Sequence, residues 1–254
     1  MASSKTKPTL FFIHGLRGSH HGLCAVTKYL ESDYNVINLD LPGYRNQPEL
    51  SPQNLAAHIE HLHATIKNLP DKPVIVAHSM GATIASRYVA QYPDDAADKL
   101  VLMSPVFRGK SRRFRDKLSY YCLAALLSPI PKNVKKKLLA SRVVSRAISH
   151  YLTADKSQQA RIDQEHYLYS GHFASARSLL ADTKLSMSHT AVVPEGKTVL
   201  LISGAKDRLS SQKLVRRMAA RHSAAHHTIT DSGHLINYER PEQVARIIAD
   251  FLRP

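Results

Sequence analysis

The residue best placed to do chemistry is Ser79, which lies between a short apolar run and a stretch of small residues. The run 74–77 is apolar and β-branched, which predicts a buried parallel strand, and residues 82–90 are typical of a helix. A serine at the apex of strand, tight turn and helix forms a nucleophile elbow, because its hydroxyl is held clear of its neighbours and faces amide donors at the helix N-terminus. Ala77 stands where the usual Gly-x-Ser-x-Gly pattern has its first glycine and keeps that position small. The alternative is that Ser79 only caps the helix, so the interpretation depends on a base, an acid and oxyanion donors elsewhere in the chain.

Alternating strand and helix patterns surround this elbow. Strands are predicted at Thr9–Ile13, 34–39, 74–77, Lys99–Met103, 197–202 and Ala225–Ile229. Helices are predicted at 20–30, 52–69 with Ser51 as its cap, 82–90, 210–221 and Pro241–Leu252. This alternation predicts an α/β fold, with a doubly wound, mostly parallel sheet of about six strands and helices on both faces. Ligands of such sheets bind beyond the carboxyl ends of the strands, and the turns 14–19, 40–45, 78–81, 203–208 and 231–234 all lie there.

The alternation stops between Phe107 and about Val193. This segment predicts helices at 118–127, 134–152, 158–169 and 174–185. We therefore expect a core of residues 1–107 and 194–254, interrupted by a helical cap of residues 108–193 that walls a substrate pocket. Helix 118–127 is apolar on most of its circumference, which favours a place in the cap's own core; the alternative is a wall for an acyl chain.

Motifs at the predicted strand ends resemble the serine-dependent α/β-hydrolase family, specifically its cap-bearing branch of esterases, lipases and thioesterases. The motifs are His14-Gly15, Asp40-Leu41-Pro42-Gly43, Ala77-His78-Ser79-Met80-Gly81, Gly204-Ala205-Lys206-Asp207-Arg208, Ser232-Gly233-His234 and Glu239-Arg240-Pro241-Glu242. The order Ser79, Asp207, His234 is the family's order of nucleophile, acid and base. The family usually has antiparallel strands before its first parallel strand, and about eight residues precede Thr9 here, so the sheet is expected to lack them.

The resemblance implies a role for each motif residue. Ser79 would attack a carbonyl carbon, His234 would take and return the proton, and Asp207 would hold the imidazole tautomer. The backbone N–H groups of Met80 and Leu16 would form the oxyanion hole. Taken alone, Asp207 could be an ordinary turn aspartate and His234 one of 15 histidines. Other polar residues lie at this edge. We expect His14 and His78 to pack and hydrogen-bond around the turns, Asp40 to fix a loop, and Arg45 and Asp231 to face water. His20 and His21 could cap the following helix or touch substrate.

Composition limits the class of protein. With 254 residues and 43% hydrophobic content, the chain is globular, and its two cysteines, Cys24 and Cys122, cannot form a disulfide framework. No apolar run has the length of a signal peptide core or a membrane span. We expect a cytoplasmic protein, with peripheral contact to the inner membrane surface.

The chain is strongly basic, with 35 Lys and Arg against 20 Asp and Glu and a formal charge of +15. The first half of the predicted cap, from Arg108 to Arg146, contains twelve Lys or Arg residues and a single acid, Asp116. The cluster could be a solvated face. Beside an apolar helix, it also suits anionic lipid or an acidic acyl carrier. No nucleic-acid-binding module is recognisable, so nucleic acid is not expected as a partner.

The leading hypothesis is a serine hydrolase that cleaves a carboxylic ester or thioester through an acyl-Ser79 intermediate. A carbon–carbon bond hydrolase or an acyltransferase would use the same triad, and a non-catalytic binding protein on this fold is a further alternative. No cofactor or metal is expected. The sequence does not identify the substrate-binding residues.

Overall fold

The computed structural model describes residues 7–253, and its centre is a six-stranded sheet in which every neighbouring pair is parallel. The strands are β1 (Thr9–Ile13), β2 (Asn35–Leu39), β3 (Val74–His78), β4 (Lys99–Met103), β5 (Thr198–Gly204) and β6 (Ala225–Ile229). Their order across the sheet is β2-β1-β3-β4-β5-β6. This confirms the predicted α/β fold of about six strands, and no antiparallel pair joins the sheet within the described residues.

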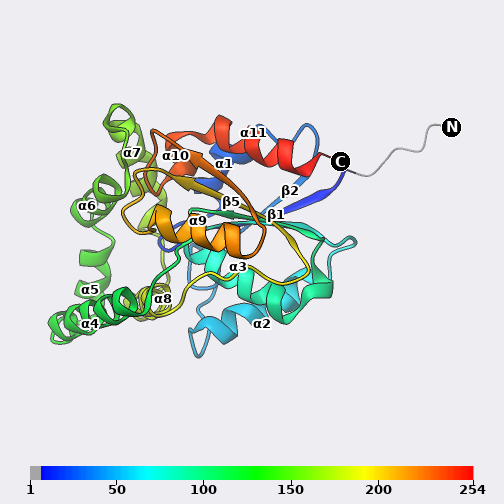
Figure 1. Cartoon of the computed structure of the whole chain (residues 1–254). Helices are drawn as coiled ribbons and strands as arrows, with labels where there is room; N and C mark the ends of the chain where they lie inside the picture. The colour runs from blue at the N-terminus through cyan, green and yellow to red at the C-terminus, as the bar shows by residue number, and fades with distance from the viewer. Residues whose placement is uncertain (1–6, 254) are drawn as a thin grey trace.

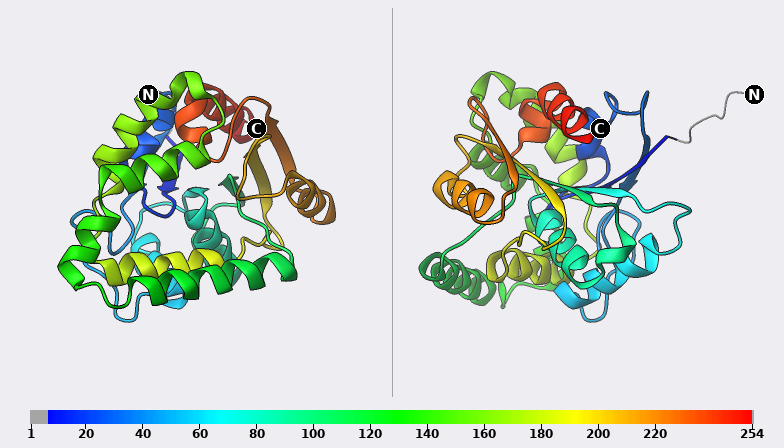
Figure 2. Two further views of the ribbon diagram at one scale, coloured as in Figure 1. Left: turned by 90° about the vertical axis from the view of Figure 1, so that its left-hand side faces the viewer. Right: turned by 45° about the vertical axis from the view of Figure 1, so that its right-hand side comes forward.

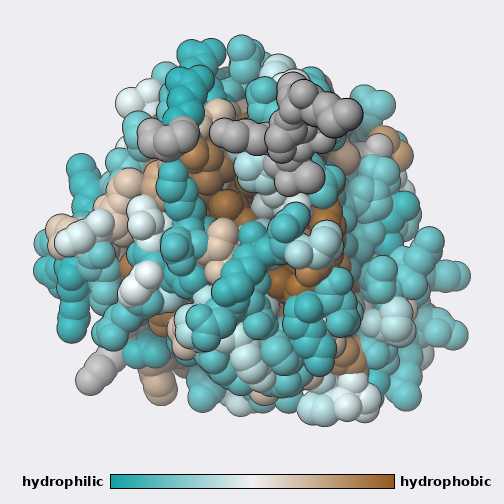
Figure 3. Space-filling view, turned by 90° about the vertical axis from the view of Figure 1, so that its right-hand side faces the viewer, coloured by the Kyte–Doolittle hydropathy of each residue, from teal (hydrophilic) through white to brown (hydrophobic). Residues whose placement is uncertain are grey.

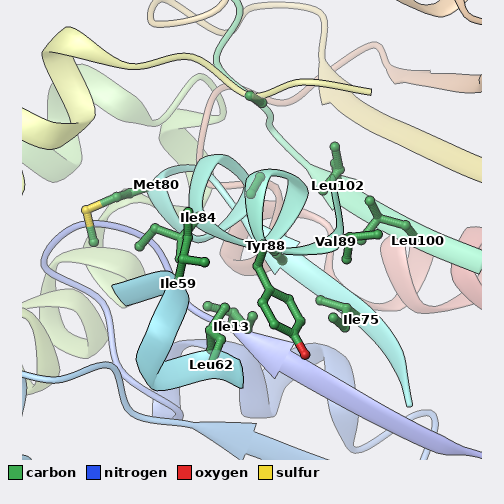
Figure 4. Packing of buried hydrophobic residues seen from close by; sticks show 14 of the residues in the cluster. Ile13, Ile59, Leu62, Ile75, Met80, Ile84, Tyr88, Val89, Leu100 and Leu102 are labelled. Atoms are coloured by element: carbon green, nitrogen blue, oxygen red, sulfur yellow. The ribbon is translucent and has the colours of Figure 1, made fainter. Parts of the chain in front are cut away.

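Helices cover both faces of the sheet, as Figure 1 shows. One face carries α2 (Leu55–Ile66), α3 (Met80–Gln91) and α9 (Gln212–Arg221), and the other carries α1 (His21–Thr27), α10 (Ile236–Glu239) and α11 (Pro241–Leu252). The central strands are buried on both faces because consecutive residues in them are apolar, with Ile75, Val76 and Ala77 fully buried. Figure 4 shows α2 and α3 packed on β1, β3 and β4 through Leu62, Ile84 and Tyr88.

Five α-helices lie between β4 and β5 in the chain. They are α4 (Lys110–Leu127), α5 (Lys132–Leu139), α6 (Arg142–Leu152), α7 (Gln159–Ser170) and α8 (Ala176–Ser188). They lie over the carboxyl ends of the strands (Figure 2), as a cap would. The predicted boundaries at 107 and 193 stay a prediction. The opposite face, at the amino ends of the strands, is mainly hydrophilic, with apolar residues in its recesses (Figure 3).

Three predictions about helices were wrong. Helix α2 begins at Leu55 and is capped by Asn54, whose side chain accepts a hydrogen bond from the N–H of Ala57, so Ser51 is not its cap. The single helix predicted over 134–152 is two helices, because the chain turns at Ala140 and Ser141 starts a new helix by accepting from the N–H of Val144.

The third error concerns residues 118–127, which form the second half of α4 rather than a separate helix. Leu127 is buried, but Leu118, Tyr121, Leu123 and Leu126 are exposed. Most of this helix therefore does not belong to the cap's own core, since α4 packs on α8 along one side.

Candidate active site

Ser79 lies at the end of β3, immediately before α3, in a backbone conformation that few residues adopt. Its φ is 54° and its ψ is −114°, and its N–H donates to the carbonyl of Met103 over 2.9 Å. Strain of this kind is retained where the surrounding structure fixes it, and it often marks a functional position. The turn leaves no room at position 81, where a Cβ would lie 2.5 Å from the carbonyl oxygen of His14.

Ser79, His234 and Asp207 form one chain of hydrogen bonds. His234 Nε2 lies 2.7 Å from Ser79 Oγ, and His234 Nδ1 lies 2.8 Å from Asp207 Oδ2. The other carboxylate oxygen, Oδ1, accepts from the N–H groups of Leu209 and Ser210. Burial alone would raise the pKa of Asp207, but the adjacent His234 and these donors lower it below its usual value. The carboxylate is therefore ionised at neutral pH, accepts the Nδ1 proton, and leaves Nε2 free to accept the serine proton.

The main chain of His234 is held by residues from three parts of the chain. Its N–H donates to the carbonyl of Leu152 in the cap (2.8 Å). Its carbonyl accepts from Ser104 Oγ (2.9 Å) and from His78 Nε2 (3.1 Å). Burial lowers the pKa of His78 to about 3, so this imidazole is neutral and its Nε2 carries the donated proton. As predicted, His78 supports the turn.

The predicted oxyanion donors come from the two turns that meet at Ser79. Met80 is the first residue of α3, and Leu16 follows Gly15, where a Cβ would lie 2.9 Å from the Cβ of Ser79. The His14 ring orders this turn, since its Nδ1 contacts the carbonyl of Gly15 (2.8 Å) and its Nε2 accepts from the N–H of Leu41 (3.0 Å). Burial lowers the pKa of His14 to about 4, which keeps the ring neutral. The participation of Met80 and Leu16 in an oxyanion hole stays a prediction.

The sequence analysis did not predict two residues that connect the loops of this site to the cap. Glu239 is buried, and its carboxylate accepts from the N–H of Gly233 (2.8 Å) and from the N–H groups of Ala154 (2.9 Å) and Asp155 (2.8 Å). It therefore ties the loop that carries His234 to the cap. The motif Glu239-Arg240-Pro241-Glu242 was the feature of the sequence that could have indicated this role.

Arg17 is the second such residue. It follows Leu16, has a φ of 59° and is buried. Its guanidinium donates to the carbonyl of Leu139 (3.0 Å) and to Ser145 Oγ (3.2 Å), both in the cap. Burial lowers its pKa to about 10, but it stays protonated at neutral pH. The turn that carries Leu16 is thus fastened to the cap, and nothing in the local sequence indicated this.

The remaining polar residues at this edge either order a turn or face solvent. Asp40 accepts from the N–H of His20 (2.8 Å) and pairs with the His20 ring (2.7 Å), so His20 does not cap α1 with its side chain. Arg45 is partly exposed and lies 3.6 Å from the Asp40 carboxylate. Asp231 is exposed beside Lys206. Within residues 7–253, no three His, Cys, Asp or Glu side chains are grouped so that they could share a metal ion.

Comparison with known proteins adds the family. The model of the alpha/beta hydrolase family matches residues 10–247. The chain belongs to this family. It is 27% identical to the Bacillus subtilis protein named uncharacterized hydrolase YugF, over 97% of this chain and 90% of the relative. It is 24% identical to a putative esterase/lipase of Haemophilus influenzae, over 96% and 83% of the two chains. The solved esterase EaEST from Exiguobacterium antarcticum shares the alpha/beta hydrolase fold with a TM-score of 0.74 at 14% identity, over 97% of this chain and 92% of that one.

Proposed function

We propose that this alpha/beta hydrolase cleaves a carboxylic ester or thioester through an acyl-enzyme on Ser79. Ser79 Oγ attacks the carbonyl carbon while its proton passes to His234 Nε2. The oxyanion accepts from the N–H groups of Met80 and Leu16. Collapse of this intermediate breaks the bond to the alcohol or thiol, which leaves with the proton from His234. Water then attacks the acyl-enzyme by the same route and releases a carboxylic acid.

The observation that carries the proposal is the continuous path from Ser79 Oγ through His234 to Asp207, with contacts of 2.7 and 2.8 Å. The Asp207 carboxylate is ionised because its pKa is lowered, and it orients the imidazole of His234 for the first step. A serine nucleophile disfavours the dehalogenase and epoxide-hydrolase reactions that use an aspartate at this position. The name of the Haemophilus relative, a putative esterase/lipase, supports the same substrate class.

The triad alone does not distinguish ester or thioester hydrolysis from related reactions. Hydrolysis of a carbon–carbon bond and acyl transfer to another acceptor would begin with the same Ser79 and His234. The basic segment of the cap favours acyl groups presented by an anionic partner, either anionic lipid or an acidic acyl carrier. A panel of esters and thioesters that varies acyl length and leaving group separates these substrates.

A fluorophosphonate probe tests the nucleophile. The wild-type protein should be labelled, because such probes react with activated serines. Ser79→Ala should remain folded, lose the label, and lose ester hydrolysis by several orders of magnitude. Ser203→Ala is the matched control, since Ser203 is also buried at the carboxyl end of a central strand, and it should keep the label. Undiminished labelling of Ser79→Ala would refute the assignment.

A further inference from the structure

The cap exposes large apolar side chains on three consecutive helices. The most exposed are Phe114 (71%) and Leu126 (73%) on α4 and Val143 (78%) on α6, with Leu118 on α4 and Val134 on α5 also more than half exposed. Single exposed apolar residues are ordinary, but a group of this size on neighbouring helices marks an interaction surface.

Helix geometry places Phe114, Leu118 and Val143 on the sides of α4 and α6 that point away from the helices packed against them. Tyr120 and Leu127 are on the side of α4 that is less exposed and packs on α8, whereas Phe114 and Leu118 are four residues apart on the other side. In α6, which packs on α7, Ser145 and Ser149 are buried and Val143 is on the opposite side. In Figure 2, α4, α5 and α6 lie in the outermost layer beyond the carboxyl ends of the strands.

The same layer is strongly cationic. Twelve Lys or Arg residues lie between Arg108 and Arg146, and the one acid among them, Asp116, is paired with Arg108 at 2.6 Å. Arg115, Lys132 and Lys137 are exposed on α4 and α5, the helices that also expose Phe114, Leu126 and Val134. A surface that combines exposed apolar side chains with excess positive charge is complementary to the boundary of an anionic bilayer, where headgroup phosphates overlie acyl chains.

We propose that α4, α5 and α6 form a docking face for an anionic lipid bilayer. Phe114, Leu118, Leu126, Val134 and Val143 enter the boundary between headgroups and acyl chains, while the surrounding Lys and Arg residues contact the lipid phosphates. Within the described residues, no helix has the length and hydropathy to cross a bilayer. An acidic protein partner would satisfy the charges but gives no equal reason for exposed apolar side chains on all three helices.

The docking face is connected to the candidate active site, and this step rests on the proposed function. Leu152, the last residue of α6, accepts the N–H of His234. Arg112 of α4 donates to the carbonyl of Arg208 (3.1 Å), next to Asp207. The helices that would bind the bilayer are therefore hydrogen-bonded to the two loops that carry His234 and Asp207.

Vesicle co-sedimentation of the whole protein tests the docking face. Phosphatidylcholine vesicles that contain phosphatidylglycerol should bind the protein more tightly than vesicles of phosphatidylcholine alone. Added salt should weaken this binding, because at physiological ionic strength charges more than about 8 Å apart are already largely screened from each other. The variant Arg115→Glu/Lys132→Glu/Lys137→Glu should bind the anionic vesicles at least about 100-fold more weakly, since each basic residue contributes roughly a fivefold increase in affinity. Phe114→Ser/Leu126→Ser should also weaken binding.

The controls match each change in chemistry. Lys213→Glu/Arg216→Glu/Arg217→Glu alters the charge equally on the exposed side of α9, and Tyr29→Ser removes an exposed aromatic ring outside the cap. Both should bind anionic vesicles much as the wild type does, and circular dichroism checks that all variants are folded.

Further measurements separate docking from catalysis. Ser79→Ala should bind vesicles like the wild type even though it hydrolyses nothing, and the docking variants should hydrolyse a short soluble ester at the wild-type rate. Equal binding to neutral and anionic vesicles would overturn the docking face, and so would equal losses in the two charge-reversal variants. Binding to a purified acidic acyl carrier protein without binding to vesicles would assign the face to that partner instead.

Discussion

At the scale of single residues, the site depends on the tautomer of His234. The Asp207 carboxylate offers only acceptors, so it holds a proton on Nδ1 and leaves a lone pair on Nε2 for the Ser79 hydroxyl. Because Leu209 and Ser210 donate to the other carboxylate oxygen, the carboxylate has one orientation. The reactivity proposed for Ser79 therefore depends on His234, which contacts it directly, and on Asp207, which contacts His234.

Asp207→Asn tests this dependence. An amide keeps the size of the side chain but can donate toward Nδ1, which favours the tautomer that carries its proton on Nε2 and cannot accept from Ser79. We expect kcat for a chromogenic ester to fall by on the order of 10³–10⁴ with little change in thermal stability. The control is Asp231→Asn, an exposed acid close in sequence to His234, which should retain its activity. Near-normal turnover of Asp207→Asn would place the acid elsewhere.

At the scale of secondary-structure elements, close approaches of backbone bring the triad together. The end of β5 meets the loop that carries His234 at Gly204, where a Cβ would lie 2.0 Å from the carbonyl oxygen of Gly233 and 2.4 Å from that of Ser232. Both contacts are with backbone, which cannot rotate away as a flexible side chain can. The absence of a side chain at Gly204 thus determines how closely the Asp207 turn and the His234 loop approach.

Gly204→Ala should therefore damage both stability and catalysis. We expect a loss of about 1–3 kcal/mol in the free energy of unfolding, typical of overpacking, together with a large fall in kcat as His234 moves away from Ser79. Gly109→Ala is the matched control, because a Cβ there meets no atom within 4 Å and the backbone φ of −69° suits alanine. Urea unfolding and ester hydrolysis measure the two effects. Equal behaviour of the two variants would contradict the close-approach argument.

At the scale of the whole molecule, buried neutral histidines lie in both the core and the cap. His14 and His78 lie under the two turns at Ser79, and His166 lies in the cap helix α7 against Tyr238. Burial lowers the pKa from 6.5 to about 4 for His14, about 3 for His78 and about 4 for His166. All three are uncharged in the folded protein at neutral pH.

These histidines predict a dependence of stability on pH. Between about pH 4 and pH 6.5 the unfolded chain binds protons at these sites and the folded chain does not, so the free energy of unfolding rises with pH and levels off above 6.5. His166→Phe removes one such site and should reduce the slope by up to about 1.4 kcal/mol per pH unit. Urea unfolding of both proteins across this range gives the two slopes. Parallel curves would mean that His166 is protonated in the folded state.

Local patterns in the sequence were enough to predict the architecture. Apolar runs indicated the central strands, because a central parallel strand must be apolar on both faces. The turns after those strands carried Ser79, Asp207 and His234, and the topology of a parallel sheet places strand ends at one edge. The structure brings these three residues within hydrogen-bonding distance, while their roles in catalysis stay predictions.

Long-range contacts decided what the sequence left open. Arg17 reaches Leu139 across 122 positions and Glu239 reaches Ala154 across 85, and a local pattern carries no information about such partners. The exposure of residues 118–127 in α4 could not be predicted either, because the same apolar sequence pattern is compatible with a helix in a core and with one on a surface. The sequence alone determined which side chains could react and on which strand ends they lie. Only tertiary packing decided how the cap fastens to the turns around Ser79 and which apolar residues it presents to a partner.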